Sequence, residues 1–106
     1  MGGEKTRIIK GLKTFKEAIR KDYGVEKIVF FGSRATGTHN KHSDVDLILV
    51  SRKFKGKSLL KRPRGLHFYW TMKYPVDFIC YTPEEFKKMR GKITIVRQAL
   101  EEGVEV

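Results

Sequence analysis

Three of the four aspartates in the chain stand at the beginning of an apolar segment. Asp44 and Asp46 open the segment DVDLILVS, and Asp77 opens the apolar part of the segment YPVDFICY. Because side chains alternate along a strand, Asp44 and Asp46 are expected on the same face, about 6.5–7 Å apart along the backbone. Carboxylates in such positions repel one another and resist burial, which indicates that a cation lies between them.

These residue types favour a hard divalent cation. If the segments at 44–51 and 74–81 are neighbouring strands, all three carboxylates meet at one end of a sheet. Oxygen ligands without His or Cys favour Mg²⁺, or Mn²⁺, over zinc. Mg²⁺ typically takes one or two carboxylates and completes its coordination shell with water and substrate phosphates.

A Gly-Ser pair, Gly32-Ser33, directly follows the apolar run KIVFF. Glycine lets the backbone approach a ligand closely, and exposed N–H groups together with the Ser33 hydroxyl can hold phosphate oxygens. Alone, this pair is a common turn after a strand, and a lone Asp-x-Asp is an equally weak signal. The combination is stronger, because ten residues separate Ser33 from Asp44 and a third aspartate opens the next strand.

The hydrophobic pattern predicts a small α/β domain that positions these residues. Continuous apolar runs predict strands at 27–31, 44–51 and 74–81. Apolar residues at helical spacing and capping signals predict helices at 4–22, 83–90 and 92–102. The second of these has a capping box from Thr82 to Glu85 with Pro83 between them, and the last is expected to pack through Ile93, Val96 and Leu100.

The connection between the second and third strands is predicted to contain a further helix. The segment RKFKGK at 52–57 is expected to be a flexible basic link. Ser58 is a suitable N-cap for a helix from Leu59, although Pro63 would also fit the first turn of a helix that starts later. The bulky apolar residues that follow are assigned mainly to the core: Leu66, Phe68, Tyr69, Trp70 and Met72.

The 106 residues are expected to form one domain, 1–106, with a net charge of +11. Asn and Gln occur once each beside abundant Lys and Glu, a bias typical of proteins from high-temperature organisms. No acid occurs from Leu47 to Val76, whereas eight bases do. This basic block, densest at 52–64, either handles a polyanion or is solvated surface, and the sequence leaves both alternatives open.

No feature of the sequence predicts secretion or membrane insertion. Apolar runs stay well short of the roughly 18–20 residues that cross a bilayer, and the start MGGEK lacks an apolar signal segment. Cys80 is the only cysteine, which excludes an internal disulfide and fits a reducing cytosol. We therefore expect a cytoplasmic protein without a membrane partner.

Taken together, Gly32-Ser33, the ten-residue gap, Asp44-Val45-Asp46 and Asp77 resemble the signature of the polymerase-β-type nucleotidyltransferase superfamily. The resemblance is closest to its short prokaryotic members, the minimal nucleotidyltransferases, and extends from the first helix to the TPEEF helix. It implies a small two-layer α/β fold with a mixed sheet, helices mainly on one face, and an active site at the end of the sheet.

The resemblance also implies tasks for the site residues. Gly32 and Ser33 would hold the β- and γ-phosphates of a nucleoside triphosphate, and Arg34 would either steady that triphosphate or form a surface ion pair.

By the same resemblance, the three aspartates would hold metal ions. Asp44 and Asp46 would bind two Mg²⁺ ions, with Mn²⁺ as the alternative. Asp77 would ligate the second ion and help to deprotonate the attacking hydroxyl. The implied reaction transfers a nucleoside monophosphate, most simply AMP from ATP, to a hydroxyl acceptor.

Larger members of the superfamily have a further domain that forms the acceptor pocket, so a chain of this length is expected to use a partner or a second copy of itself. Short members resemble the antitoxin half of a two-protein module, in which AMP is placed on a tyrosine of a HEPN-type RNase.

Two other functions stay open. One is a module that neutralises a partner by contact alone, and the other is an enzyme that acts on RNA ends. Nucleic acid is the least favoured partner, because no RNA-binding motif accompanies the basic block.

Overall fold

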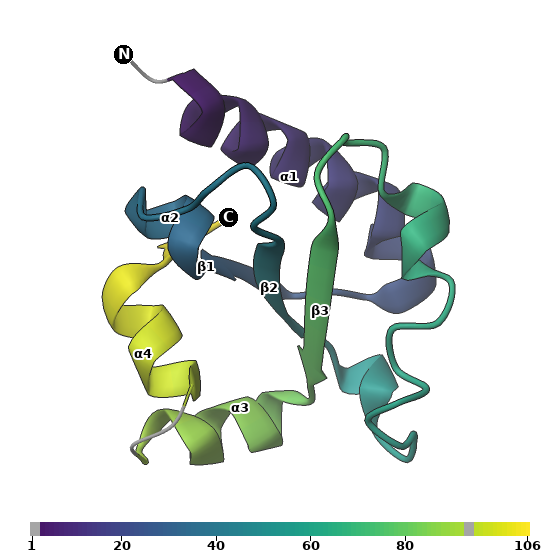
Figure 1. The fold of residues 1–106 in the computed structure, drawn as a ribbon. Coiled ribbons are helices and arrows are strands. Elements are labelled where there is room, and N and C mark those ends of the chain that lie inside the picture. Colours follow the sequence, from purple (N-terminus) through teal and green to yellow (C-terminus); the bar gives the residue numbers. More distant parts are fainter. Residues whose placement is uncertain (1–2, 93–94) are drawn as a thin grey trace.

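The computed structural model describes residues 3–92 and 95–106 (Figure 1). The helices are α1 (Gly3–Tyr23), α2 (Ser33–Thr36), α3 (Pro83–Arg90) and α4 (Ile95–Glu102). The strands are β1 (Lys27–Phe31), β2 (Val45–Val50), β3 (Val76–Tyr81) and β4 (Val104–Glu105). Two 3₁₀ helices lie between β2 and β3, namely η1 (Arg52–Phe54) and η2 (Leu66–Tyr69). Within these described ranges, no helix has the length and apolar character that crossing a membrane requires.

The four strands form one mixed sheet in the order β3-β2-β1-β4. β1 is antiparallel to β2 and to β4, whereas β2 and β3 run parallel. These two predicted strands are therefore neighbours, which is the condition for their aspartates to meet. The register pairs Phe31 with Asp46, and Asp46 with Asp77. The carboxyl end of β1 and the amino ends of β2 and β3 therefore meet at one end of the sheet.

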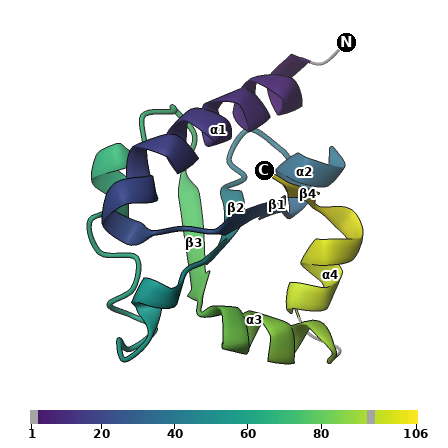
Figure 2. The ribbon, with the colours of Figure 1, turned by 180° about the vertical axis from the view of Figure 1, so that it is seen from behind.

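Helices cover both faces of the sheet, so the prediction that they lie mainly on one face is wrong. Figures 1 and 2 show α1 on one side of the sheet and α3 and α4 on the other. Alternate residues of β1 and β2 pack against α1, and the intervening residues Val29, Phe31, Ile48 and Val50 pack against Phe86 of α3 and Val96 and Ala99 of α4. Strands that are apolar on both faces need a helix layer on each side.

The predicted α-helix between β2 and β3 does not form. Pro63 lacks an N–H group, and Gly65 has a φ of 84°, a left-handed conformation that interrupts any helix passing through it. The chain instead turns repeatedly until η2. Three residues per turn in a 3₁₀ helix place Leu66 and Tyr69 on the same side, against the core, while Phe68 points outward and is 89% exposed. The assignment of Phe68 to the core is therefore wrong.

The basic link after β2 is anchored, not flexible as predicted. Phe54 of η1 is buried in the core, and the Ser51 hydroxyl accepts a hydrogen bond from the Lys53 N–H at 3.1 Å. The capping box of α3 is confirmed, with Thr82 and Glu85 each accepting a hydrogen bond from the backbone N–H of the other.

The chain ends in a short strand that the sequence pattern did not indicate. β4 pairs with β1, and Lys16 Nζ of α1 donates to the Val106 carbonyl at 2.9 Å. In α4, Ala99 is buried beside Val96, whereas Leu100, predicted to pack inward, is 36% exposed. The predicted contact of Ile93 lies outside the described residues.

Candidate active site

The sheet brings the three predicted aspartates together. Asp46 lies beside Asp77 in the parallel register, and Asp44 directly precedes β2. Asp44 and Asp77 are exposed and Asp46 is half-buried. Burial raises the pKa of Asp46 above its usual value, and the charges of Asp77 and Asp44 raise it further. The three carboxylates thus form one electrostatic unit at this end of the sheet.

The Gly-Ser turn directly adjoins this unit. Gly32 has φ 82° and ψ −167°, a conformation that is essentially restricted to glycine. A Cβ atom at this position would overlap the carboxylate of Asp46. Glycine is therefore required at this position for two reasons, namely the backbone conformation and the close approach of Asp46.

Ser33 begins the short helix α2, which runs only to Thr36. Gly32 supplies no side-chain cap, and the first N–H groups of a helix have no partner within it. The N–H groups of Ala35 and Thr36 donate to the Gly32 carbonyl, which leaves those of Ser33 and Arg34. Ser33 is partly exposed, so its hydroxyl and these two N–H groups can be offered to an anionic ligand. The turn therefore has the groups that hold phosphate oxygens, and it lies next to Asp46.

Arg34 forms an ion pair, the predicted alternative to a phosphate contact, but its side chain is buried and not at the surface. The side chain is 4% exposed, and its Nε donates to the Ser43 carbonyl at 2.8 Å. Nη1 pairs with Glu4 of α1, and the guanidinium lies over the ring of Tyr74, 4.7 Å from its centroid. These partners occupy the guanidinium and the side chain is almost fully buried, which favours the ion pair over contact with a triphosphate.

Arg34 instead positions the loop that leads to Asp44. Besides the Ser43 carbonyl, Nη2 lies 3.5 Å from the Asn40 carbonyl and 3.4 Å from that of Lys41. Sequence reasoning missed this arrangement, because Glu4 lies thirty residues earlier in the chain and no motif connects the two.

The residues present fit a divalent metal ion. No three His, Cys, Asp or Glu side chains among residues 3–92 and 95–106 are grouped closely enough to form a ready-made metal centre. The three aspartates are nevertheless near enough for two of them to raise the pKa of the third. A cation would relieve this repulsion, and Mg²⁺ needs only one or two carboxylates besides water and phosphate oxygens.

Cys80 is not a candidate nucleophile. It lies on the α1 side of the sheet, opposite the face of Asp77, and is buried in the core. Burial raises the pKa of its thiol to about 12, so it remains protonated at neutral pH.

Residues 12–106 match the family described as nucleotidyltransferase domain, and no curated protein matches the chain significantly. Among solved structures, a candidate nucleotidyltransferase from Sulfolobus solfataricus is 25% identical, with a TM-score of 0.61 over 78% of this chain and 74% of that one. This likeness confirms the predicted small α/β fold with a mixed sheet. The BolA domain of SufE1 from Arabidopsis thaliana is 24% identical, with a TM-score of 0.49 over 72% of this chain and 94% of that one, a likeness too weak to bear on function. Because the family match spans most of the sequence, the chain belongs to the nucleotidyltransferase domain family.

Proposed function

We propose that residues 1–106 form one nucleotidyltransferase domain that uses Mg²⁺ and ATP to transfer AMP to a tyrosine hydroxyl of a HEPN-type protein partner, and so acts as the antitoxin of that partner. The class of partner rests on the resemblance of the sequence to minimal nucleotidyltransferases. The transfer chemistry rests on the family match and on the arrangement of the site.

One observation carries the transfer chemistry, namely the packing of Gly32 against the carboxylate of Asp46, which the register places beside Asp77. A turn that can hold phosphate oxygens thus adjoins carboxylates that can hold a divalent cation. A nucleoside triphosphate that arrives with its metal needs both groups side by side.

Each residue has a task that follows from its position. The N–H groups at the start of α2 and the Ser33 hydroxyl bind the β- and γ-phosphates. Asp44 and Asp46 would hold two Mg²⁺ ions, or Mn²⁺ in their place. Asp77, exposed beside Asp46, would share the second ion and accept the proton of the attacking hydroxyl.

The transfer forms a bond from the acceptor oxygen to the α-phosphorus and breaks the bond from that phosphorus to the bridging oxygen of pyrophosphate. The hydroxyl proton passes to Asp77, and pyrophosphate leaves from the turn at Gly32 and Ser33. Divalent cations bound there would neutralise the charge that builds on the attacking and leaving oxygens.

A second function, neutralising a partner by contact alone, is favoured by an exposed apolar group in the connection between β2 and β3. Leu59 is 61% exposed, Leu60 91% and Phe68 89%. Where such side chains lie together they form an apolar patch of the kind that another protein covers. Such contact is compatible with catalysis. The two functions are therefore separated by variants that remove a carboxylate of the site, because these variants abolish transfer and leave the contact surface intact.

The test is to incubate the chain with Mg²⁺, the protein encoded by the adjacent gene as the proposed HEPN-type partner, and ATP labelled on either the α- or the γ-phosphate. AMP transfer labels the partner from α-labelled ATP alone. Asp46→Asn and Asp77→Asn should abolish the label. Glu84→Gln, which alters an exposed carboxylate in the first turn of α3, should retain it.

Label from γ-labelled ATP would mean phosphoryl transfer and would contradict the proposal. A partner that is inhibited without ATP, and equally well by Asp46→Asn, would establish contact as the function instead.

A further inference from the structure

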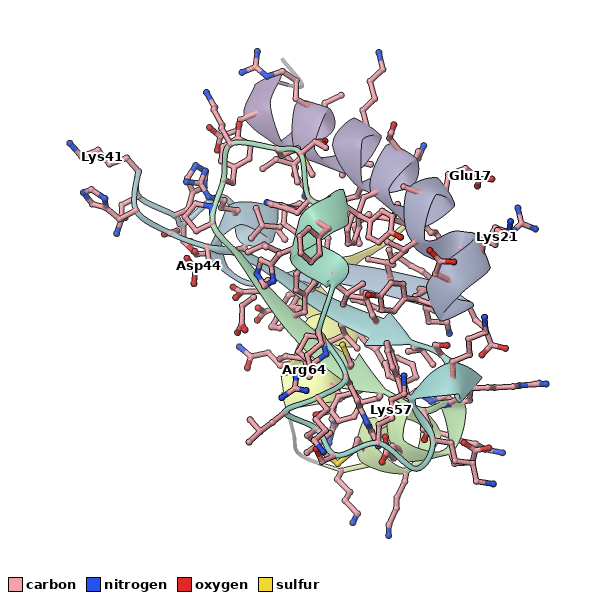
Figure 3. All side chains as sticks on the ribbon, turned by 90° about the vertical axis from the view of Figure 1, so that its right-hand side faces the viewer. Glu17, Lys21, Lys41, Asp44, Lys57 and Arg64 are labelled. Carbon is pink, nitrogen blue, oxygen red and sulfur yellow. The ribbon has the colours of Figure 1, made fainter. Side chains whose placement is uncertain are left out.

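A basic pocket of about 480 Å³ lies at the opposite end of β2 from the three carboxylates. It begins at Lys53 and Phe54, just after β2 ends, and extends to the last residues of α1 and to Tyr69 of η2. Figure 3 shows Lys57 and Arg64 of its wall on a different part of the molecule from Asp44. The charged side chains that line it are five cations and one carboxylate: Lys53, Lys57, Lys61, Arg62, Arg64 and Asp22.

Two of the five cations are already used by the fold. Lys53 Nζ donates to the Lys21 carbonyl at the end of α1, at 3.0 Å. Arg62 is 6% exposed and forms a two-pronged ion pair with Glu85. The carboxylate of Asp22 is also engaged, since it accepts a hydrogen bond from the Tyr69 hydroxyl at 2.7 Å.

The remaining three cations, Lys57, Lys61 and Arg64, are exposed, and none forms an ion pair within residues 3–92 and 95–106. Because the sequence has no acid from Leu47 to Val76, the connection that carries them cannot neutralise them locally. Like charges held around a hollow create a positive potential that an anion in the hollow relieves.

The backbone that carries these cations is fixed before any ligand arrives. Arg62 Nε donates to the Lys57 carbonyl at 3.0 Å, and Nη1 donates to the Cys80 carbonyl at 3.1 Å. The Tyr23 hydroxyl donates to the Arg64 carbonyl at 2.7 Å, which ties the same connection to α1. A site that is held in place by buried groups loses less conformational freedom when it binds a ligand.

We propose that this basic pocket binds a ligand with two or more phosphate groups, either a free polyphosphate or the backbone of single-stranded RNA. Two ammonium groups and a guanidinium offer many N–H donors and no acceptor, which matches phosphate oxygens. The site lies at the far end of the sheet from Asp44, Asp46 and Asp77, so it is independent of the proposed transfer reaction.

Amide NMR spectra of the full chain, recorded without divalent cations, test the proposal. Inorganic tripolyphosphate and a short oligouridylate are added in separate titrations. Saturable shifts should appear at the amides of residues 53–64, and Lys57→Gln/Lys61→Gln should weaken binding by at least about tenfold. Lys5→Gln/Lys10→Gln removes the same charge from exposed positions on α1 outside the pocket and should bind as the wild type does.

Saturation by tripolyphosphate without tighter binding of the oligouridylate identifies a free polyphosphate as the ligand. Tighter binding of the oligouridylate, with an affinity that falls steeply as salt is added, identifies the RNA backbone. Shifts that do not saturate, that occur only at residues 32–36, or that are lost equally in the control variant would overturn the proposal.

Discussion

Gly32 both sets the path of the backbone after β1 and leaves space for a carboxylate of the site. Its positive φ lets the chain turn sharply out of β1, and its missing side chain leaves room for the carboxylate of Asp46. The phosphate-binding turn and the carboxylates can adjoin each other only while both conditions hold.

Replacing this glycine should therefore damage both stability and binding. We expect Gly32→Ala to lower the free energy of unfolding by about 1–3 kcal/mol, from backbone strain, and to weaken ATP binding in the presence of Mg²⁺. Gly56→Ala is the matched control, because Gly56 has a similar φ of 81° but open space around its Cβ position. Urea unfolding and calorimetric titration measure the two effects. Equal ATP affinity in both variants would contradict the assigned role of Gly32.

Repulsion among the three carboxylates should lower the free energy of unfolding when no cation is bound. Because Asp77 and Asp44 repel the half-buried charge of Asp46, we expect Asp46→Asn to stabilise the metal-free protein by about 0.5–2 kcal/mol. The same variant should lose the rise in melting temperature that Mg²⁺ gives the wild type. Melting curves with EDTA and with Mg²⁺ check both statements. A variant less stable than the wild type in EDTA would show that this repulsion is unimportant.

Residue types and spacing predicted the shared face of Asp44 and Asp46 and the Gly-Ser turn, because strand alternation is a short-range consequence of the sequence. That Asp77 joins them depends on the pairing of β2 with β3, which could be stated from the sequence only as a condition. The place of Arg34 could not be predicted in this way. Its partners include Glu4, and that contact exists only after α1 has packed across the sheet.

At the scale of elements, Arg62 joins the irregular connection after β2 to the first turn of α3. Its guanidinium reaches both the Lys57 carbonyl and the Glu85 carboxylate, which also completes the capping box with Thr82. Continuous apolar runs and capping signals predicted three strands and α3. They could not predict this connection, because the positive φ of Gly65 and the long-range bonds of Arg62 decide its path.

This link should give the protein a defined sensitivity to acid. The hydrogen bond from Arg62 lowers the pKa of Glu85 to about 2, against about 4.3 in an unfolded chain. A lowered folded pKa stabilises the native state fully above about pH 4.3, and this stabilisation is lost as the pH falls toward 2. Glu85→Gln should therefore be less stable than the wild type at pH 7, and the difference should shrink toward pH 2. The midpoints of urea unfolding of both proteins, measured between pH 7 and pH 2, test this prediction. A difference between the two midpoints that does not change with pH would refute it.

At the scale of the whole molecule, helices cover both faces of the sheet. The net charge of the chain is +11. The second helix layer follows from strands that are apolar on both faces, a pattern present in the sequence. The short strand β4 does not follow from such a pattern, because it has two residues and depends on its pairing with β1.

The excess positive charge should oppose folding through self-repulsion when salt is scarce. We expect the melting temperature to rise between about 0.01 M and about 0.15 M NaCl, as the Debye length falls from about 30 Å to about 8 Å. Lys57→Gln/Lys61→Gln should show a smaller rise, because it removes two of the five cations that line the basic pocket. A melting temperature that is unchanged or falls with salt would show that ion pairs outweigh this repulsion.

Pyrophosphate release, counted against AMP attached to the HEPN-type partner, tests the central claim most directly. With ATP and Mg²⁺, the wild-type chain should release one pyrophosphate for each tyrosine modified. Neither product should form with Asp77→Asn or with EDTA. Orthophosphate in place of pyrophosphate, or equal yields from the wild type and Asp77→Asn, would contradict nucleotidyl transfer at the three aspartates.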